Sequence, residues 1–429
     1  MSSFHVQTFG CRASQADGAA IAEALLGEGL HPAANAAEAQ LVVLNSCTVT
    51  SLADEDVRNT IHRVHRENSQ ARILVTGCYA QRAPEEIAVL PGVYWVVGNS
   101  HQARIPEIVT QSEAHYHGQI HVGDIFDQHE FLSSPVEGAA AHRTRPNLKI
   151  QDGCNNRCSF CIIPFVRGQS RSAPAGQIVE QVRSLAPRYR EVVLTGISLG
   201  RWGREAGSTL RLADLLRRLL NETSIDRIRL SSVEPMDWSD DLLDLLATSA
   251  RIAKHVHAPL QSGSDRVLRR MHRKYRPRHY ADRILKARAW MPNAAVGADV
   301  MTGFPGETEA EFEETRAFIA SLPFTYLHVF TYSERPGTPA AAAQSQVPME
   351  VRRDRNRVLR ELAAEKNLEF RRRMLGRSLS VVTLSDGALS DNFLKVELAS
   401  PRERNQMIDV KIGSLTSNGL REHSALTVL

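Results

Sequence analysis

The chain has 429 residues, of which 23% are charged and 42% hydrophobic, an ordinary composition for a soluble globular protein of two or three domains. It lacks an apolar run of the ~20 residues needed to span a bilayer, and its first residues lack the pattern of a signal peptide, so we expect a cytoplasmic protein without a membrane segment. The net charge is only +4, yet positive charge is concentrated past the midpoint, as a polyanionic partner would require.

Residues 3–110 alternate short apolar runs with helix-like stretches, which predicts a parallel α/β sheet. The expected strands are residues 4–8, 41–44 and 73–76, and the expected helices are 17–29 and 54–67. Cys11, Cys47 and Cys78 each follow one of these strands, so the topology would gather them on one rim, where such sheets bind ligands. A single cysteine there is usually a small buried residue, but three at equivalent positions favour a metal cluster.

Residues 113–143 show little periodicity and are expected to form a linker. A predicted strand at 147–151 then leads into a loop that holds Cys154, Cys158 and Cys161, separated by three and then two residues. Thiolates packed this tightly suit a soft metal centre, and a [4Fe–4S] cube held by three of them keeps one iron open for a small molecule. The alternatives are a zinc site completed by His142, or three cysteines that merely pack.

Further strands are predicted at 191–195, 227–231, 255–260, 295–301 and 326–332. Helix-like stretches at 176–186, 210–220, 240–248, 277–290 and 309–321 separate them. Six such units are too few for an eight-fold barrel, so we expect a partial (β/α)₆ barrel with its chemistry at the carboxyl ends of the strands.

Polar groups and glycines follow several of these strands. Thr195 and Gly196 end the second strand, and a glycine there lets a ligand approach the backbone closely. Glu234 follows the third strand, where a solvated loop carboxylate is an equal alternative. Gln261 and Ser262 follow the fourth strand, and Glu307, after the fifth, could equally be a helix-start acid.

A basic segment at 266–288 contains ten Lys or Arg residues against one Asp. We expect it to contact RNA, although a run of charge is more often a solvated helix face. The candidate RNA-binding residues are Arg269, Arg270, Arg273, Lys274 and Arg276, with His272 and Tyr275 among them. A second basic segment at 352–377 has a net charge of +6, but glutamates interrupt it. Residues 376–429 contain four or five short strands, enough for a small barrel.

The CxxxCxxC spacing with Phe160 before its last cysteine resembles the signature of radical S-adenosylmethionine (SAM) enzymes. In that family the open iron binds the amino and carboxylate groups of SAM, and an electron from the cluster splits SAM into methionine and a 5′-deoxyadenosyl radical. The resemblance implies catalytic roles for Cys154, Cys158 and Cys161. The SAM contacts that it implies are Phe160, Thr195, Gly196, Glu234, Gln261 and Ser262.

Over nearly the whole chain, the sequence resembles the radical SAM methylthiotransferases. In them, three separated cysteines like Cys11, Cys47 and Cys78 hold an auxiliary [4Fe–4S] cluster, and the terminal barrel is a TRAM domain, an OB-like RNA-binding module. The implied domains are 1–112 with the auxiliary cluster, a linker at 113–143, the radical SAM domain at 144–375 and a TRAM-like domain at 376–429.

Residues 8–12, 77–81, 194–197 and 328–339 most resemble the branch that acts on N6-threonylcarbamoyladenosine at position 37 of tRNA. Ser46 stands where Thr is expected and Thr331 where Pro is expected, and neither change removes a ligand. The implied reaction replaces the hydrogen on carbon 2 of the adenine by a methylthio group: one SAM donates methyl to sulfur on the auxiliary cluster, and a second SAM removes the hydrogen.

The implied partners are the tRNA anticodon loop and an electron donor such as flavodoxin or ferredoxin, and the implied state is a cytoplasmic monomer. Three alternatives stay open. Within the family, the substrate could be isopentenyladenosine in tRNA or an aspartate of a ribosomal protein. The chain could also be another two-cluster sulfur-inserting enzyme, or an iron–sulfur RNA-binding regulator without turnover.

Overall fold

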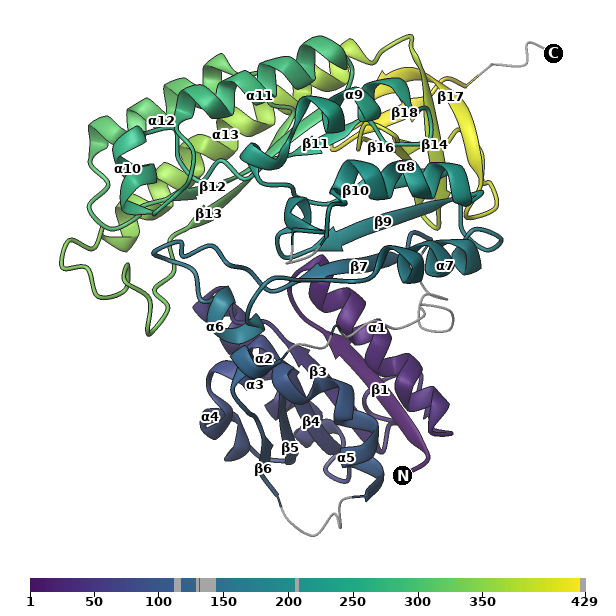
Figure 1. Cartoon of the computed structure of the whole chain (residues 1–429), viewed down its shortest axis with the longest axis vertical. Helices are drawn as coiled ribbons and strands as arrows, with labels where there is room; N and C mark the ends of the chain where they lie inside the picture. Colours follow the sequence, from purple (N-terminus) through teal and green to yellow (C-terminus); the bar gives the residue numbers. More distant parts are fainter. Residues whose placement is uncertain (112–116, 129–130, 132–143, 205–207, 425–429) are drawn as a thin grey trace.

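The computed structural model describes residues 1–111, 117–128, 131, 144–204 and 208–424 (Figure 1). Most of the predicted linker, with His142, lies outside the described residues. An amino-terminal α/β domain lies below a curved layer of parallel strands and helices, and the carboxy-terminal strands form a small barrel at its side (Figure 1). The predicted fold class, mixed α/β with parallel sheets and a terminal β-barrel, is confirmed.

Within the described residues, the amino-terminal domain contains a six-stranded parallel sheet in the order β2-β1-β3-β4-β5-β6. Its strands are β1 (Ser3–Thr8), β2 (His31–Pro32), β3 (Leu41–Ser46), β4 (Arg72–Gly77), β5 (Val93–Gly98) and β6 (Gln119–His121). Its helices are α1 (Arg12–Gly27), α2 (Ser51–Glu67), α3 (Cys78–Arg82), α4 (Pro84–Ala88) and α5 (Ile105–Gln111). The sequence did not predict β2, β5 and β6. Strands β2 and β6 have two and three residues and so show no periodicity, but β5 is a six-residue apolar strand that the pattern could have indicated.

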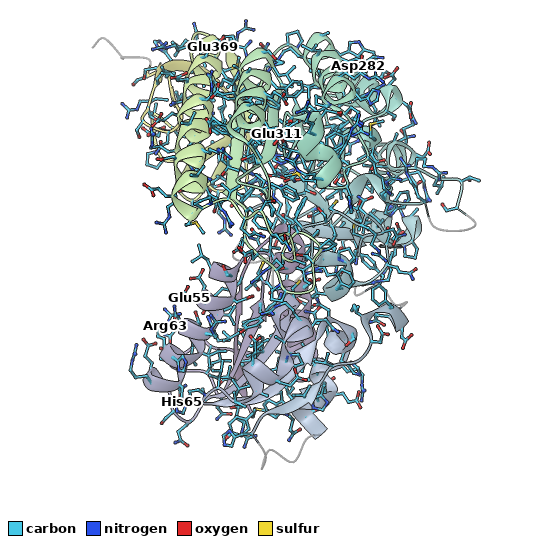
Figure 2. All side chains as sticks on the ribbon, turned by 90° about the vertical axis from the view of Figure 1, so that its left-hand side faces the viewer. Glu55, Arg63, His65, Asp282, Glu311 and Glu369 are labelled. Carbon is cyan, nitrogen blue, oxygen red and sulfur yellow. The ribbon has the colours of Figure 1, made fainter. Side chains whose placement is uncertain are left out.

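Both faces of this sheet are buried. Successive side chains of β3 point to opposite sides, and those on each side pack against helices. Val42 packs in one core with Val57 and Ile61 of α2, whereas Val43 packs in another with Leu25 of α1. Helix α2 buries positions three or four residues apart and leaves Glu55 and Arg63 on its outer side (Figure 2).

The central domain is an open barrel of parallel strands, each followed by a helical connection. Its strands are β7 (Asn147–Asp152), β9 (Glu191–Gly196), β10 (Arg227–Leu230), β11 (His255–His257), β12 (Ala295–Thr302) and β13 (Tyr326–Thr331). Its helices are α6 (Ile163–Arg167), α7 (Ala175–Leu185), α8 (Leu212–Glu222), α9 (Asp240–Thr248), α10 (Asp265–Arg270), α11 (Pro277–Trp290), α12 (Glu309–Ser321) and α13 (Met349–Arg373). An isolated bridge between Ile228 and Ile252 joins the two sheets of the barrel.

At one edge of this barrel, β7 pairs with the short antiparallel strand β8 (Arg171–Ser172). Helix α1 of the amino-terminal domain packs against β7. The side-chain amide of Asn147 donates to that of Gln15 at 2.9 Å, which fixes α1 against β7. The two domains are therefore in direct contact through α1, which begins next to Cys11.

The carboxy-terminal barrel closes in the order β14-β15-β16-β18-β17. Its strands are β14 (Ser378–Leu384), β15 (Gly387–Ser390), β16 (Lys395–Glu397), β17 (Met407–Leu415) and β18 (Leu420–Glu422). Arg229 of β10 donates to the carbonyl oxygens of Ser390 at 2.9 Å and Asp391 at 3.0 Å, and Phe393 stacks on His255 of β11 with ring centroids 4.6 Å apart. In the part of the chain that is described, no helix is long and apolar enough to cross a membrane.

A buried ion cluster at the start of β9 makes the fold sensitive to acid. Burial alone would raise the pKa of Glu191, but Arg229 above all, with Arg145 and Arg227, lowers this pKa from 4.5 to about 2. The carboxylate therefore contributes stability that is present above about pH 4.5.

We expect Glu191→Gln to lower the free energy of unfolding by roughly 3 kcal/mol at pH 7, the order implied by a shift of this size. The difference from the wild type should shrink as the pH falls from about 4.5 toward 2, because the wild-type carboxylate becomes protonated. Urea unfolding between pH 3 and 7 measures it. A difference independent of pH would contradict the charged pairing.

Candidate functional site

The loop after β7 holds Cys154, Cys158 and Cys161 in a fixed conformation. Gly153 before it has a φ of +68°, and a Cβ there would lie 1.9 Å from the carbonyl oxygen of Gln169, so only glycine fits. The amide of Cys154 donates to the carbonyl of Gly168 at 3.0 Å, and that of Cys161 to the carbonyl of Cys158 at 3.1 Å. The backbone conformation at Gly153 and these backbone hydrogen bonds therefore fix the shape of the loop.

Without a metal these three thiols could not all be ionised side by side, whereas a metal cluster would bind them as thiolates. Burial above all, and then the neighbouring Cys158 and Cys154, raise the pKa of Cys161 to about 12, because three thiolates in this space would repel. A bound metal removes this penalty. The amide of Asn156 donates to the sulfur of Cys154 at 3.4 Å, the kind of hydrogen bond that stabilises a cluster thiolate. The donor set therefore fits a [4Fe–4S] cluster with one iron left without a protein ligand.

Cys11, Cys47 and Cys78 lie together at the carboxyl ends of β1, β3 and β4. A Cβ on Gly10 would lie 2.8 Å from the sulfur of Cys47, so the loop that carries Cys11 passes directly over Cys47. Burial above all, and then Cys78 and Cys11, raise the pKa of Cys47 to about 12. The three thiols are close enough to repel as thiolates, so this set also fits a metal cluster.

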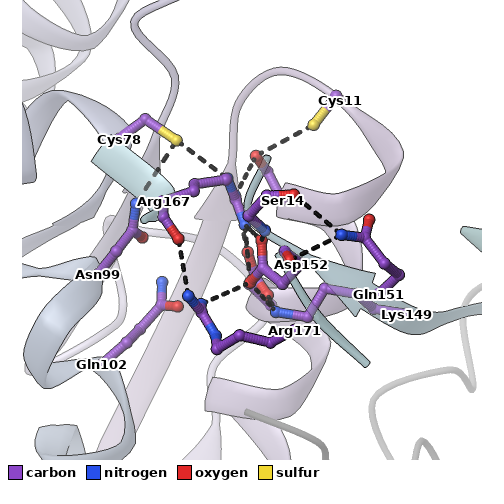
Figure 3. A network of polar contacts seen from close by, with 12 residues as sticks. Cys11, Ser14, Cys78, Asn99, Gln102, Lys149, Gln151, Asp152, Arg167 and Arg171 are labelled. Atoms are coloured by element: carbon purple, nitrogen blue, oxygen red, sulfur yellow. Dashed lines mark hydrogen bonds and ion pairs between the residues drawn. The ribbon is translucent and has the colours of Figure 1, made fainter. Parts of the chain in front are cut away.

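A buried ion network joins the first cysteine set along the chain, which consists of Cys11, Cys47 and Cys78, to β7 (Figure 3). Arg167 of α6 donates to the sulfur of Cys78 at 3.3 Å and pairs with Asp17 at 2.9 Å and Asp152 at 3.1 Å. Lys149 pairs with the same two carboxylates, with 2.9 Å to Asp152. Asp152 is two residues before Cys154, so one network contacts a ligand of one set and the strand that carries the other.

A cavity of about 290 Å³ extends from the second cysteine set, which consists of Cys154, Cys158 and Cys161, toward the first. One side is Phe160, Cys161 and the two isoleucines that follow, and the other is Val49 and Thr50, just after Cys47. The barrel side is lined by Gln261, Asp299, Met301 and residues 330–333. Mostly apolar walls with a few polar groups are typical of a site for a small organic molecule.

The structure distributes the six predicted SAM contacts unequally. Phe160 and Gln261 line the cavity between the cysteine sets, and Gln261 has a φ of +63°, a conformation that costs a non-glycine residue energy and is often found at ligand sites. Glu234 borders a smaller cavity beside Cys158. Gly196 packs against Gln151, and Thr195 is buried in β9.

Ser262 does not suit a ligand contact. It is fully buried, and its hydroxyl bonds with that of Thr315 at 2.9 Å and accepts from the amide of Ser264 at 3.1 Å. Its role in this structure is to hold the turn after β11.

The predicted RNA-binding residues of segment 266–288 are mostly paired with acids that lie outside the segment, either directly before it or far away in the chain. Arg270 binds both carboxylate oxygens of Glu311 at 2.8 and 2.9 Å. Arg269 and Arg276 both pair with Asp265, at 2.9 and 3.3 Å. The charge excess inside the segment therefore overstates its free positive surface.

Arg273 corrects the prediction most clearly, because its side chain is only 6% exposed. It donates to the sulfur of Cys158 at 3.2 Å and pairs with Glu234 at 2.5 Å, so it belongs to the cluster site and is not a surface contact for phosphate. Lys274 is exposed and lines two cavities, one of about 180 Å³ shared with Asn156 and Arg201. It is the candidate of the five that best suits an RNA phosphate.

Sequence reasoning missed Arg167 and Asp299. A buried arginine six residues after Cys161 gives no signal, because its two carboxylate partners are 150 and 15 residues away. Asp299 stands inside an apolar strand, and a polar residue within a predicted buried strand is the only signal that could have indicated it.

Comparisons with known proteins agree with this arrangement. A model of the radical SAM superfamily matches residues 148–319, and a model described as uncharacterized protein family UPF0004 matches residues 3–98. The chain is 35% identical to the threonylcarbamoyladenosine tRNA methylthiotransferase MtaB of Aquifex aeolicus, over 95% of this chain and 99% of that protein. It is 40% identical to the protein of the same name from Bacillus subtilis, over 82% and 78%. This chain belongs to the radical SAM tRNA methylthiotransferase family.

The methylthiotransferase family also includes the tRNA-2-methylthio-N(6)-dimethylallyladenosine synthase of Sphingopyxis alaskensis, which is 33% identical over 97% of this chain and 96% of that protein. Membership implies a [4Fe–4S] cluster and SAM as cofactors. Among solved structures, the radical SAM methyltransferase TsrM from Kitasatospora setae superposes with a TM-score of 0.57 at 16% identity, over 80% of this chain and 77% of that one. That likeness concerns the fold alone.

Arg167→Met tests the ion network of this methylthiotransferase. The change leaves the buried carboxylates of Asp17 and Asp152 short of one cation and removes a donor to Cys78. We expect the free energy of unfolding to fall by roughly 3–5 kcal/mol, and iron bound by the first cysteine set to decrease. Urea unfolding and iron analysis under anaerobic conditions measure the two effects.

Arg183→Met is the matched control, because Arg183 pairs with Glu180 while its side chain is 46% exposed. It should change the free energy of unfolding by about 0–1 kcal/mol. Equal losses in the two variants would show that the network is not a structural joint.

Proposed function

We propose that this chain adds a methylthio group to carbon 2 of N6-threonylcarbamoyladenosine at position 37 of tRNA, and that Cys11, Cys47 and Cys78 hold a second [4Fe–4S] cluster for this reaction. The observation that carries the proposal is the cavity of about 290 Å³, which has Cys161 in one wall and the segment after Cys47 in another. When bound, the clusters and SAM supply the sulfur, the methyl group and the one-electron chemistry. An aromatic C–H bond requires such cofactors because acid–base groups cannot break it.

The chain's own residues bind and orient the base in this proposal. Phe160, Met301 and Phe330 provide the apolar walls against which a flipped purine would pack. Position 37 lies in a single-stranded loop, so its base can leave the stack at low cost. Exposed Lys274 near Cys158 would contact the loop phosphates, and the carboxy-terminal barrel would bind more of the tRNA.

Relatives of two names match the chain over most of its length, so identity alone does not separate the threonylcarbamoyl substrate from the dimethylallyl one. The polar groups of the barrel wall support the threonylcarbamoyl reading. Gln261 offers hydrogen bonds to a polar substituent, whereas a hydrocarbon substituent would leave its amide without that partner, and Asp299 adds a charged group to the same wall. The dimethylallyl substrate is the second candidate.

The two cysteine sets should have separable roles. Replacing Cys154, Cys158 and Cys161 by Ala should abolish the release of 5′-deoxyadenosine from SAM, because the site of SAM binding is lost. Replacing Cys11, Cys47 and Cys78 by Ala should block methylthiolation but retain some release. In either triple variant, iron should fall from about eight to about four per chain. Wild-type protein with only about four irons after anaerobic reconstitution would rule out the second cluster.

The nucleoside composition of tRNA tests the substrate. In a strain that lacks this gene, we expect the methylthio form of N6-threonylcarbamoyladenosine to disappear and its unmodified precursor to accumulate, as measured by mass spectrometry. Complementation with the wild type should restore it, and complementation with Cys158→Ala should not. Loss of the dimethylallyl-derived form instead would assign the chain to the second candidate function. Unchanged tRNA would reject both.

A further inference from the structure

One wall of the barrel contains a carboxylate shared by two imidazoles. Asp299 of β12 lies 3.1 Å from Nε2 of His257 on β11 and 3.1 Å from Nδ1 of His328 on β13. The three residues stand on adjacent parallel strands, and Asp299 is directly opposite His328 in the strand register. The neighbouring strands therefore hold these side chains together independently of any loop.

Hydrogen bonds behind the imidazoles fix how they point. The hydroxyl of Tyr326 lies 2.7 Å from Nδ1 of His257 and 2.7 Å from Nε2 of His255. Because burial above all, and then Arg229, lowers the pKa of His255 well below its ordinary value, this ring is neutral. With Nδ1 bonded to Tyr326, His257 directs Nε2 toward Asp299 and the cavity wall.

One donor in this cluster has no well-aligned partner. Nε2 of His257 is buried and near Asp299, but among the described residues no acceptor completes a hydrogen bond of good geometry with it. His328, in contrast, has a side chain that is 53% exposed. An aligned acceptor between the two rings would give this buried nitrogen a better hydrogen bond than Asp299 alone provides.

The charges around the cluster favour an anion as this acceptor. One carboxylate serves two imidazoles, so an anion between the rings would give the second ring an acceptor of its own. Arg12 lies deeper in the same interior, close to Phe393, and its buried Nη1 has no hydrogen-bond partner among the described residues. Burial and then Arg145 lower the pKa of Arg12, as expected where positive charge is in excess.

The cluster also lies where a substituent of the base would reach it. Asp299 lines the cavity between the cysteine sets, and His328 lines a second cavity of about 290 Å³ together with Tyr326 and Phe393. A group attached to a purine in the first cavity would meet Asp299, and Nδ1 of His328 lies 3.1 Å from that carboxylate.

We propose that His328 and His257, oriented by Asp299, form a subsite for a carboxylate on the N6 substituent of the target adenine. The inference rests on the proposed function and names its specificity element: the threonylcarbamoyl group ends in a carboxylate and a hydroxyl, whereas the dimethylallyl group has neither. A site built to hydrogen-bond a polar group discriminates strongly against an analogue that lacks it.

The test uses reconstituted enzyme and three anticodon stem-loops, which carry threonylcarbamoyladenosine, its carboxylate methyl ester, or dimethylallyladenosine at position 37. We expect wild-type enzyme to bind the acid about tenfold or more tightly than the ester, as measured by fluorescence anisotropy. His328→Gln and Asp299→Asn should each reduce this ratio to about threefold or less, mainly by weakening binding of the acid. Iron content and the visible cluster absorption check that both variants are assembled.

His279→Gln is the control, because His279 is exposed on α11 and should leave the ratio unchanged. Equal binding of acid and ester by the wild type, or an unchanged ratio in both variants, would overturn the subsite even if the enzyme modifies the threonylcarbamoyl stem-loop. Modification of the dimethylallyl stem-loop alone would instead overturn the proposed function.

Metal analysis separates direct recognition from a metal-mediated one, since one ligand atom from each of the three residues lies within 4.8 Å of the others. About one zinc per chain that is retained by the wild type and lost in His328→Gln would overturn direct recognition by the imidazoles.

Discussion

The placement of the two cysteine sets depends on Arg167, which is buried between the amino-terminal domain and the barrel. Its guanidinium has five donors in a rigid plane, and it uses them on Cys78, Asp17 and Asp152, which belong to three different elements. Lys149 supplies the second positive charge, so two cations face two carboxylates with almost no access to water. Such a set is a poor source of net stability, but it penalises any other docking of the domains, because a displaced carboxylate would stay buried and unpaired.

That docking determines the shape of the cavity, because each of its walls comes from a different part of the chain. The second cysteine loop, the segment after Cys47 and the strands β11 to β13 meet there. Arg335, just beyond β13, pairs with Asp54 of α2 at 2.8 Å and donates to the carbonyl of Thr48 at 2.9 Å. The cavity is therefore held at two places, by Arg167 on the α1 side and by Arg335 on the side of β13.

The fold and the cysteine positions could be predicted because they depend on local signals. Cysteines after apolar runs, and a close cysteine spacing, need no knowledge of distant contacts. The pairing of arginines could not be predicted, because the partner of Arg270 is 41 residues away and that of Arg273 is 39 residues away. The net charge of segment 266–288 therefore did not indicate which of its cations face solvent. The cluster of His257, Asp299 and His328 depends on strand register, which periodicity does not provide.

Phe393 belongs to the carboxy-terminal barrel, yet it completes the interior of the central one. It adopts a φ of +66°, which is unfavourable for an aromatic residue, and in this conformation its ring stacks on His255 and lies 5.6 Å from the guanidinium of Arg229. A domain that fills its neighbour's core in this way is not an independent module. An exchange of the carboxy-terminal domain between members of the family would have to preserve the Phe393 ring and its backbone conformation. We therefore expect the two domains to have evolved as one unit.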